Sequence, residues 1–235
     1  MQKIKVCHLT TVHEPFDDRI FHKQCRSLLK EGYEVVVIAQ HDKDKIAKGI
    51  NVIALKKSKN RIARIISSTI QIFFCALKQK ADIYHFHDPE LLPIGVLLKI
   101  FSRKKIVYDV HEDYGKQILS KPYLPKWSRR SISILINLIE YCATGFFDGI
   151  ITATDDVLKK FSYHKTAVSV KNYPVISYFS EEKNTENKHN NGKVFKLVYA
   201  GNISKERGVI ETIQSLAYID QPLKLSFYGN CDLNN

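Results

Sequence analysis

The chain has few features of a protein from an oxidising compartment or from the membrane interior. Its five cysteines are scattered and show no CxxC pair, so we expect neither a disulfide framework nor a zinc site. Lys3 and Lys5 interrupt the first apolar run, so we expect no secretory signal. The longest uncharged apolar-rich run, residues 65–77, is shorter than a membrane span. These absences favour a cytoplasmic location.

Positive charge is concentrated in the first three quarters of the chain. Residues 1–175 contain 29 lysines and arginines against 17 aspartates and glutamates, whereas residues 176–235 contain seven of each. Such a balance indicates a polyanionic partner, for example an anionic lipid or a phosphorylated substrate. Because no nucleic-acid-binding motif accompanies it, we expect no nucleic acid partner. A lysine-rich solvated surface is the alternative interpretation.

Strand and helix signals alternate along the chain, and the strands are continuously apolar. This pattern predicts an α/β fold with a Rossmann-like parallel sheet that helices cover on both faces. The expected strands are 4–10, 33–39, 50–55, 82–86, 105–110, 149–153 and 168–170. The expected helices are 17–29, 61–79, 89–101 and 128–147, with a short one capped by Thr154 or Asp155.

Polar residues gather where three of these strands end. They lie in residues 13–19 (HEPFDDR), 85–90 (HFHDPE) and 109–113 (DVHED). Parallel sheets bind ligands at the carboxyl ends of their strands, so we expect the three loops to share a cleft. We expect His111 to face that cleft with Asp88 or Glu90 nearby.

Two kinds of chemistry fit these clusters. A metal hydrolase would use His85, His87, Asp88 and His111 as ligands, since imidazole and carboxylate suit a divalent metal. A group transferase would instead place one histidine near a sugar and use acidic residues to bind hydroxyl groups. For the transferase, the substrate-binding candidates are His13, Asp18, Arg19, His87, Asp88, Glu90 and Glu112.

A second region resembles the start of another nucleotide-binding domain. Residues 198–208 read as a strand, a glycine turn and the start of a helix, and residues 223–229 read as a further strand. Gly201 lets a phosphate approach the backbone, and Lys205 and Arg207 lie beside that turn. We therefore divide the chain into a first domain (1–175), a polar linker (176–194) and the truncated start of a second domain (195–235). With so few elements, the segment is expected to dock on the first domain, to remain mobile or to pair with a missing half. Otherwise Leu197, Val198, Leu223, Leu225 and Phe227 would stay partly exposed.

Four motifs together resemble bacterial family 4 glycosyltransferases. They are residues 8–28 (HLTTVHEPFDDRIFHKQCRSL), 82–93 (DIYHFHDPELLP), 108–113 (YDVHED) and 199–208 (YAGNISKERG). The resemblance covers nearly the whole chain.

The resemblance implies a GT-B architecture, with two facing Rossmann-like domains. The first would hold a glycan or lipid-linked acceptor and the second a nucleotide-sugar, with retention of anomeric configuration and no metal or other cofactor. His111 matches the family's active-site histidine, and Arg207 matches the basic residue that meets the diphosphate. Assembly of a surface polysaccharide or glycolipid is the implied pathway.

The sequence also departs from the family. Residues 14–16 (EPF) replace a Gly-Gly turn, and Asn202 replaces an arginine. The family's Glu-x7-Glu motif would lie beyond Asn235, so the chain is expected to lack most of its donor site. A non-catalytic remnant, or half of a split enzyme that needs a partner chain, is therefore the competing hypothesis.

Two basic and apolar helical segments raise the question of membrane contact. Residues 61–78 and 128–139 each fit an interfacial helix near anionic lipid, and each also fits a helix that covers a parallel sheet. The expected location is therefore the cytoplasm, with peripheral contact at the inner face of the membrane as an additional expectation.

Overall fold

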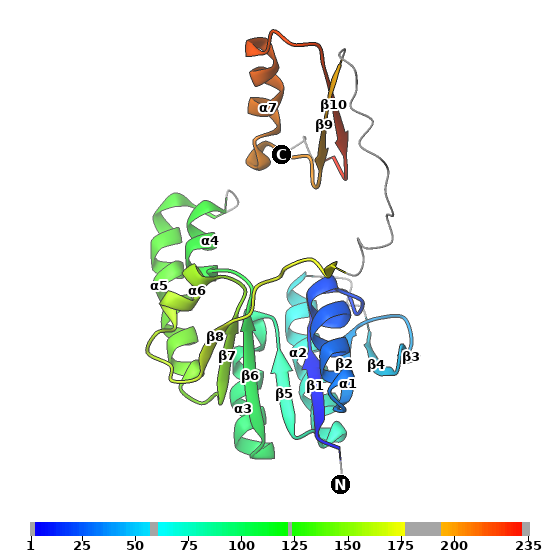
Figure 1. Ribbon diagram of the computed structural model, residues 1–235. Helices are drawn as coiled ribbons and strands as arrows, with labels where there is room; N and C mark the ends of the chain where they lie inside the picture. The colour runs from blue at the N-terminus through cyan, green and yellow to red at the C-terminus, as the bar shows by residue number, and fades with distance from the viewer. Residues whose placement is uncertain (1–2, 57–60, 122–123, 177–193, 232–235) are drawn as a thin grey trace. The chain divides into compact units, whose positions relative to one another are not determined.

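The structure is a computed structural model that describes residues 3–56, 61–121, 124–176 and 194–231. The chain divides into two compact units, Met1–Val175 (unit 1) and Ile176–Asn235 (unit 2). Figure 1 shows both, and each is described here by itself. The segment expected to be a polar linker falls almost entirely on residues 177–193, outside the described residues.

Unit 1 is built on one sheet of eight described strands in the order β3-β4-β2-β1-β5-β6-β7-β8. All neighbouring strands are parallel except β3, which runs antiparallel to β4. The strands are β1 (Lys5–Leu9), β2 (Glu34–Gln40), β3 (Lys45–Ala47), β4 (Ile50–Leu55), β5 (Ile83–Phe86), β6 (Lys105–Val110), β7 (Gly149–Thr152) and β8 (Ala167–Ser169). The predicted α/β fold with a parallel sheet is confirmed.

Helices cover the sheet on both faces, as Figure 1 shows. They are η1 (Asp18–Cys25), α1 (Arg26–Lys30), α2 (Arg61–Gln79), η2 (Pro89–Leu91), α3 (Leu92–Ser102), α4 (Tyr114–Ser120), α5 (Lys126–Thr144) and α6 (Asp155–Lys160). Ile20 and Phe21 of η1 pack on β2 and β4 to form one core cluster. On the other face, α2, α3, α5 and α6 pack over the sheet in a larger cluster around Tyr84, Phe86 and Tyr108.

The sheet reverses its direction of winding at β1. Cys7 pairs in register with Val36 of β2 on one side and with Tyr84 of β5 on the other. The loops after β1 and β5 therefore leave the sheet in opposite directions, and such a switch point at the carboxyl ends of the strands is where parallel sheets bind ligands. The predicted polar clusters lie at this point.

The first helix begins where the sequence indicates. Asp17 accepts hydrogen bonds from the backbone amides of Arg19 and Ile20, each at 2.9 Å, and so caps the helix. The first two turns are wider than an α-helix, with π-helical geometry over η1. Gly32, at φ 87°, ends the segment in a conformation that favours glycine.

Two elements were not predicted from the sequence. The β3 strand forms a hairpin with β4 through Lys48 and Gly49, which have φ angles of 50° and 82°. The α4 helix begins after Asp113, whose side chain accepts a hydrogen bond from the amide of Lys116. Both are short, so neither gives the periodicity that marks a longer element.

The described part of unit 2 contains two parallel strands and one α-helix. Its described elements are β9 (Phe195–Ala200), η4 (Lys205–Arg207), α7 (Val209–Ser215), η5 (Leu216–Tyr218) and β10 (Leu223–Tyr228). The predicted order of strand, glycine turn, helix and strand is confirmed. Val209 is the one residue that is buried among those described in this unit. Leu197 and Val198 are 47% and 65% exposed.

Candidate functional site

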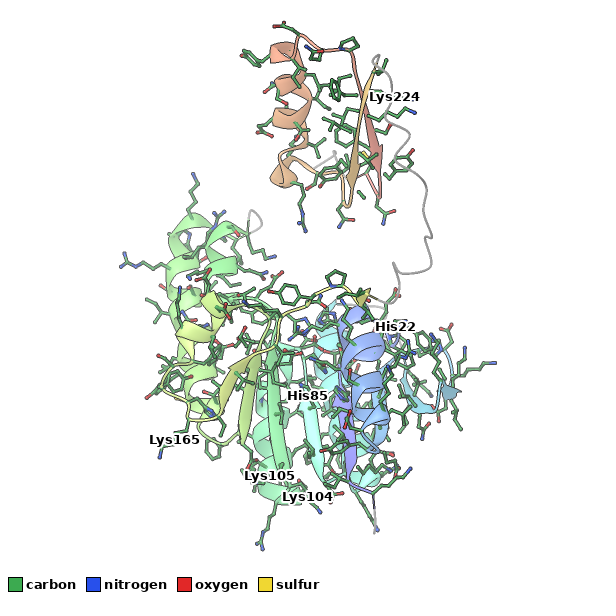
Figure 2. All side chains as sticks on the ribbon, in the orientation of Figure 1. His22, His85, Lys104, Lys105, Lys165 and Lys224 are labelled. Carbon is green, nitrogen blue, oxygen red and sulfur yellow. The ribbon has the colours of Figure 1, made fainter. Side chains whose placement is uncertain are left out.

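The three predicted loops meet at the carboxyl edge of the sheet in unit 1. His13 follows β1, Asp88 follows β5, and His111 follows β6. His13 Nε2 lies 3.5 Å from Asp88 Oδ1, and the rings of His13 and His111 have centroids 4.7 Å apart. Figure 2 places the labelled Lys104 and Lys105 at the other end of the sheet, where the strands begin. The convergence of polar loops at one edge is confirmed.

Asp109 is the centre of this arrangement, and its side chain is fully buried. Arg19 donates to both carboxylate oxygens, from Nε at 3.0 Å and from Nη2 at 2.8 Å. Gln24 Nε2 donates to Asp109 Oδ2 at 2.6 Å. The bidentate geometry fixes Arg19 strongly and brings η1 against β6.

Two histidines approach the same carboxylate. His87 Nδ1 lies 3.3 Å and His111 Nε2 lies 3.4 Å from Asp109 Oδ2. Burial by itself would raise the pKa of Asp109, but His111, His87 and Arg19 outweigh burial and hold that pKa well below its usual value. Asp109 is therefore an anion that faces two imidazole rings.

His111 is the candidate catalytic residue, and its side chain is 15% exposed. Among the described residues, Nε2 of this ring is buried without a hydrogen-bond partner. The expected neighbours were Asp88 or Glu90, whereas the residues in contact are Asp109, His13 and His87. His13 connects His111 to Asp88, because it contacts both.

His13 forms a second ion pair with Asp17, whose Oδ2 lies 3.5 Å from His13 Nδ1. The hydrogen bond to Asp17 is the main cause that raises the pKa of His13. Burial opposes ionisation of Asp17, but His13 and the capped amides lower its pKa to about 2. The loop after β1 therefore places beside His111 an imidazole whose pKa is raised by its acidic neighbours.

Asp88 and Glu90 organise the loop after β1. Asp88 Oδ2 accepts hydrogen bonds from Thr10 Oγ1 at 2.8 Å and from the amide of Thr11 at 2.6 Å. Glu90 Oε1 accepts from Thr11 Oγ1 at 2.5 Å. One oxygen of Asp88 is thus occupied within the protein, while Oδ1 faces His13.

Three of the predicted substrate-binding residues lie in other surroundings. Arg19 is 5% exposed and directs Nε, Nη1 and Nη2 to Asp109 and to the carbonyl of Val170. Asp18 is mostly exposed and pairs with Lys23 at 2.5 Å. Glu112 is exposed. The structure therefore brings together His13, His87, Asp88, Glu90 and His111, ties Arg19 to them, and leaves Asp18 and Glu112 apart.

A buried histidine group lies beneath the edge. His8 Nδ1 and His87 Nε2 are 3.0 Å apart, and the His85 ring lies against both. Burial lowers the pKa of all three rings, that of His85 to about 3. They are therefore neutral at physiological pH.

Among the side chains that the structure describes, two groups have donor atoms close enough to hold a metal ion. They are His8, His85 and His87, and His87, Asp109 and His111, with ligand atoms within 4.8 Å of one another. The ligands expected for a hydrolase were His85, His87, Asp88 and His111. They do not lie together as one group, because Asp88 is hydrogen-bonded to the loop after β1. The first group is at most 5% exposed, which leaves no open position for water, and Asp109 already binds Arg19 and Gln24. The arrangement therefore does not fit a hydrolytic metal centre.

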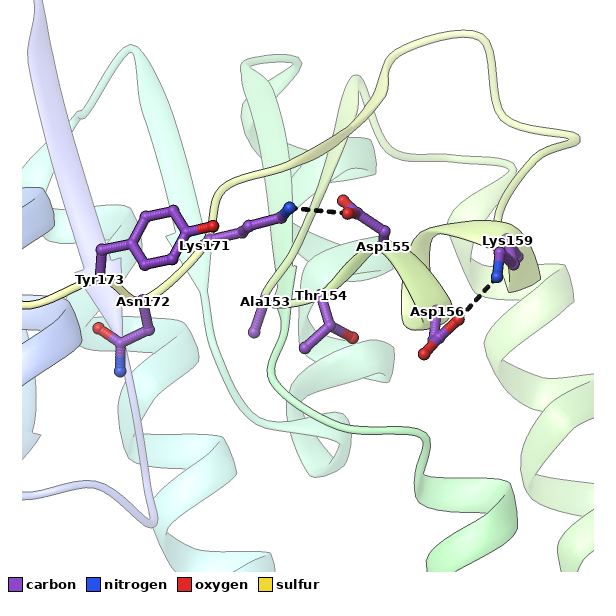
Figure 3. A pocket seen from close by; sticks show the side chains of 8 residues that line it. All are labelled: Ala153, Thr154, Asp155, Asp156, Lys159, Lys171, Asn172 and Tyr173. Atoms are coloured by element: carbon purple, nitrogen blue, oxygen red, sulfur yellow. Dashed lines mark hydrogen bonds and ion pairs between the residues drawn. The ribbon is translucent and has the colours of Figure 1, made fainter.

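An open pocket of about 690 Å³ lies at the ends of β7 and β8. Figure 3 shows its walls, in which Lys171 pairs with Asp155 and Lys159 with Asp156. The lining residues are Ala153, Thr154, Asp155, Asp156, Lys159, Lys171, Asn172 and Tyr173. Carboxylates, ammonium groups, an amide and one aromatic ring offer the contacts that a hydroxyl-rich ligand needs.

In unit 2, the glycine turn brings two loops into close contact. Gly201 has φ 151°, and its amide donates to the carbonyl of Tyr228 at 2.9 Å. A side chain on Gly229 would lie 1.8 Å from the Gly201 carbonyl oxygen. Lys205 and Arg207 follow in η4, and Gly208, at φ 69°, precedes α7. The two basic residues therefore share one short helical turn beside Gly201.

The sequence places Asp17 and Asp109 in the predicted polar clusters but indicates no role for either side chain, and it does not mark Gln24 at all. Asp109 occupies the fifth position of β6, so its hydrophobic neighbours made it look like part of a strand. Its spacing of two residues from His111 was the signal that both would emerge at one edge. Gln24 lies on a helix 85 residues from its partner, and no local pattern marks such a contact.

The family model of Glycosyltransferase Family 4 matches residues 18–165. A comparison with curated protein sequences gives no match. Among solved structures, sucrose-phosphate synthase from Thermosynechococcus elongatus is similar with a TM-score of 0.66 and 12% identity. The match covers 99% of this chain and 64% of that one, so the chain spans less than two thirds of that relative.

Two further structures have the same fold. A glycosyltransferase from Rickettsia africae gives a TM-score of 0.57 at 11% identity, with 97% of this chain and 69% of that chain covered. Anabaena HepE in complex with UDP and glucose gives 0.53 at 12% identity, with 96% and 70% covered. These similarities show the GT-B fold, and the family model shows the family. The chain belongs to glycosyltransferase family 4.

Proposed function

We propose that this chain takes part in the transfer of a sugar from a nucleotide-sugar to a glycan or lipid-linked acceptor. Family membership supports glycosyl transfer in general, and HepE is a structural neighbour that binds UDP and glucose. The observation that carries the proposal is the approach of His111 to the buried carboxylate of Asp109 at the edge of the sheet. In this proposal, Asp109 holds and orients the imidazole of His111 against the donor sugar.

The edge offers charge stabilisation without a large rearrangement. Asp109 stays ionised because Arg19 and Gln24 hold it, so its field acts continuously on the rings of His111 and His87. Preorganised charges of this kind stabilise developing charge in a transition state better than mobile ones do. Our proposal gives the catalytic role to His111 and the positioning role to Asp109.

We place acceptor binding on unit 1 and donor phosphate binding on unit 2. We propose that the substrate contacts come from His13, His87, Asp88 and Glu90 at the edge. Asp18, Arg19 and Glu112, which the sequence also suggested, are less suited to contact a substrate. Arg19 is engaged by Asp109 and Val170, Asp18 by Lys23, and Glu112 is exposed. The pocket beside Tyr173 extends the acceptor surface. Gly201, Lys205 and Arg207 are proposed to meet the diphosphate.

A second candidate role is that of one half of an enzyme completed by further polypeptide. The observation that favours it is the open sheet of unit 2, where Leu197 and Val198 are 47% and 65% exposed. Parallel sheets are normally covered on both faces. The proposed setting is surface polysaccharide or glycolipid assembly in the cytoplasm, at the inner face of the membrane.

The test is complementation in the encoding organism after its own gene is deleted. His111→Ala should lower transfer to the surface glycan by about a hundredfold or more, because it removes a group that acts in the transition state. His22→Ala, a histidine on η1 that Figure 2 labels, is the matched control and should restore the glycan. Equal activity of His111→Ala and the wild type would overturn the assignment.

The purified 235-residue chain tests the second role. Supplied with a set of nucleotide-sugars and no other protein, it should turn over none of them. Turnover by this chain alone would refute the need for further polypeptide, and His111→Ala should then abolish most of that turnover.

A further inference from the structure

Helix α5 has an exposed side that the packing of unit 1 leaves without a partner. Its buried residues, Ser133, Glu140, Ala143 and Thr144, lie on one side of the helix. The opposite side exposes large apolar side chains: Trp127, Ile134, Leu135, Leu138, Ile139 and Tyr141 are 84%, 60%, 55%, 56%, 45% and 58% exposed. We call these six residues the α5 face.

The α5 face follows the helix for most of its length. Trp127, Ile134, Leu138 and Tyr141 are spaced by three, four or seven residues, so they form one stripe along the axis. Leu119 of the neighbouring α4, 46% exposed, is a further apolar side chain beside the helix. Figure 1 shows α4 and α5 side by side at the margin of the unit. Contiguous apolar surface of this kind marks an interaction site on a globular protein.

The charge on the exposed side of the helix is of one sign. Lys126, Arg129 and Arg130 lie in its first turns, and Arg129 donates to the carbonyls of Leu119 and Leu124. The helix has one acidic residue, Glu140, which is 1% exposed, accepts from Tyr108 and pairs with Lys160 at 2.5 Å. No carboxylate of α5 therefore reaches its exposed side.

We propose that the α5 face binds the surface of an anionic phospholipid membrane. Such a surface supplies phosphate groups for the basic end and hydrocarbon for the apolar stripe. Aromatic residues at both ends of the stripe, Trp127 and Tyr141, suit the boundary between headgroups and acyl chains. Among the described helices, none combines the length and the apolar character needed to cross a bilayer, so the helix lies in the interface.

This inference goes beyond glycosyl transfer, because binding to a surface needs no donor or acceptor. The α5 helix is chosen for its own six exposed apolar side chains beside a cationic end. On α2, whose side chains are described from Ser67 onward, Ile70 and Phe74 are 52% and 58% exposed. The proposal therefore assigns the membrane contact to α5.

The chain contains a single tryptophan, and it lies on this face. Vesicles of phosphatidylcholine with phosphatidylglycerol should shift the emission of Trp127 to shorter wavelength and shield it from acrylamide. Vesicles of phosphatidylcholine alone should do so far less, and added salt should weaken the effect. Unchanged Trp127 emission with anionic vesicles would overturn the proposal.

Vesicle flotation with variants tests the site. The double variant Ile134→Ser/Leu138→Ser should lower the bound fraction about tenfold, and Lys126→Glu/Arg130→Glu should do the same. The matched controls are Ile70→Ser/Phe74→Ser on α2 and Lys165→Glu, and both should float like the wild type. All these side chains are exposed or on the surface, so circular dichroism should show every variant folded. Loss of binding in the α2 control with retention in the α5 variant would refute the assignment.

A second copy of the chain is the other occupant that the experiment distinguishes. Sedimentation that shows a dimer lost in Ile134→Ser/Leu138→Ser, together with no vesicle binding by the wild type, would identify a dimer interface and overturn the lipid proposal. Because no nucleotide-sugar is present in these assays, their failure would leave the proposed transfer reaction untouched.

Discussion

Units 1 and 2 both begin with a parallel strand that leads into a polar turn and a helix, yet only one has a completed core. In unit 1, Val37 of β2 is fully buried between β1 and β4, with helices on both faces of the sheet. In unit 2, Val198 of β9 is 65% exposed beside a single neighbouring strand. The local sequence signals of the two units are alike. The units differ in how many helices and strands cover their apolar strands. Burial, and not local propensity, decides which unit is expected to be stable.

The largest expected effect is on the core of unit 1. Asp109→Ala leaves the buried guanidinium of Arg19 without its partner, and an unpaired buried charge costs about 3–5 kcal/mol of unfolding free energy. Urea unfolding followed by circular dichroism measures this loss. Asp156→Ala, which removes an 85% exposed acid paired with Lys159, is the control and should leave the midpoint unchanged. Equal losses of unfolding free energy in both variants would show that the Asp109 network does not account for the greater stability expected of unit 1.

The second largest expected effect is the destabilisation of unit 1 by acid. Burial lowers the folded-state pKa of His8, His85 and His87 below the unfolded value of about 6.5, so the unfolded chain binds more protons. Stability is thus fully present above about pH 6.5 and is lost as the pH falls toward 3, the folded-state value for His85. Below about pH 4, protonation of Asp109 and Asp17 adds to the loss, since their folded-state pKa values are lowered.

Urea midpoints between about pH 7 and pH 4.5 check this slope. His85→Leu should flatten it, because it removes one of the three buried rings; His85 Nε2 has no hydrogen-bond partner among the described residues. The described part of unit 2 has no histidine, so its hydrogen exchange, corrected for the intrinsic rate, should not follow the same slope. A midpoint that stays constant over this range would contradict the neutral state of the three rings.

The smallest effect is confined to unit 2. Gly229→Ala places a side chain 1.8 Å from the carbonyl oxygen of Gly201, so the two loops must separate. We expect a loss of about 1–3 kcal/mol, visible as faster amide exchange in β9 and β10, with exchange in β1 and β5 unchanged. Gly145→Ala, where the nearest heavy atom would be 3.5 Å away, is the matched control. Faster exchange in β1 after Gly229→Ala would show that the units are not independent.

Much of the fold followed from the sequence because long apolar segments repeat with clear periods. The range predicted for α2 agrees with Arg61–Gln79, and Asp17 caps the first helix as its position suggested. β3 was missed because three residues give too little alternation, and the turn at Lys48 and Gly49 was not recognised. α4 was missed because it is a short helix between two polar segments.

The candidate site was predictable in place but not in its contacts. Parallel topology alone put His13, Asp88 and His111 at one edge, since all three follow strands of the same sheet. It did not show that Arg19 would turn inward to Asp109 while the adjacent Asp18 faces solvent. That choice depends on the helix entry set by Asp17 and on a partner 90 residues away. Contacts of this range have no local sequence signal.

The hydrogen bond from Arg19 to the Val170 carbonyl has a consequence for how the protein is made. It joins residues 151 positions apart, and the central strand β1 needs β5 before it has both neighbours. During synthesis, β1 therefore lacks one neighbouring strand until β5 has been made, and Arg19 lacks its last partner until Val170 has been made. Non-local pairing of this kind slows folding and leaves apolar strands exposed meanwhile. The first helix therefore gains its complete set of contacts only when nearly all of unit 1 is present.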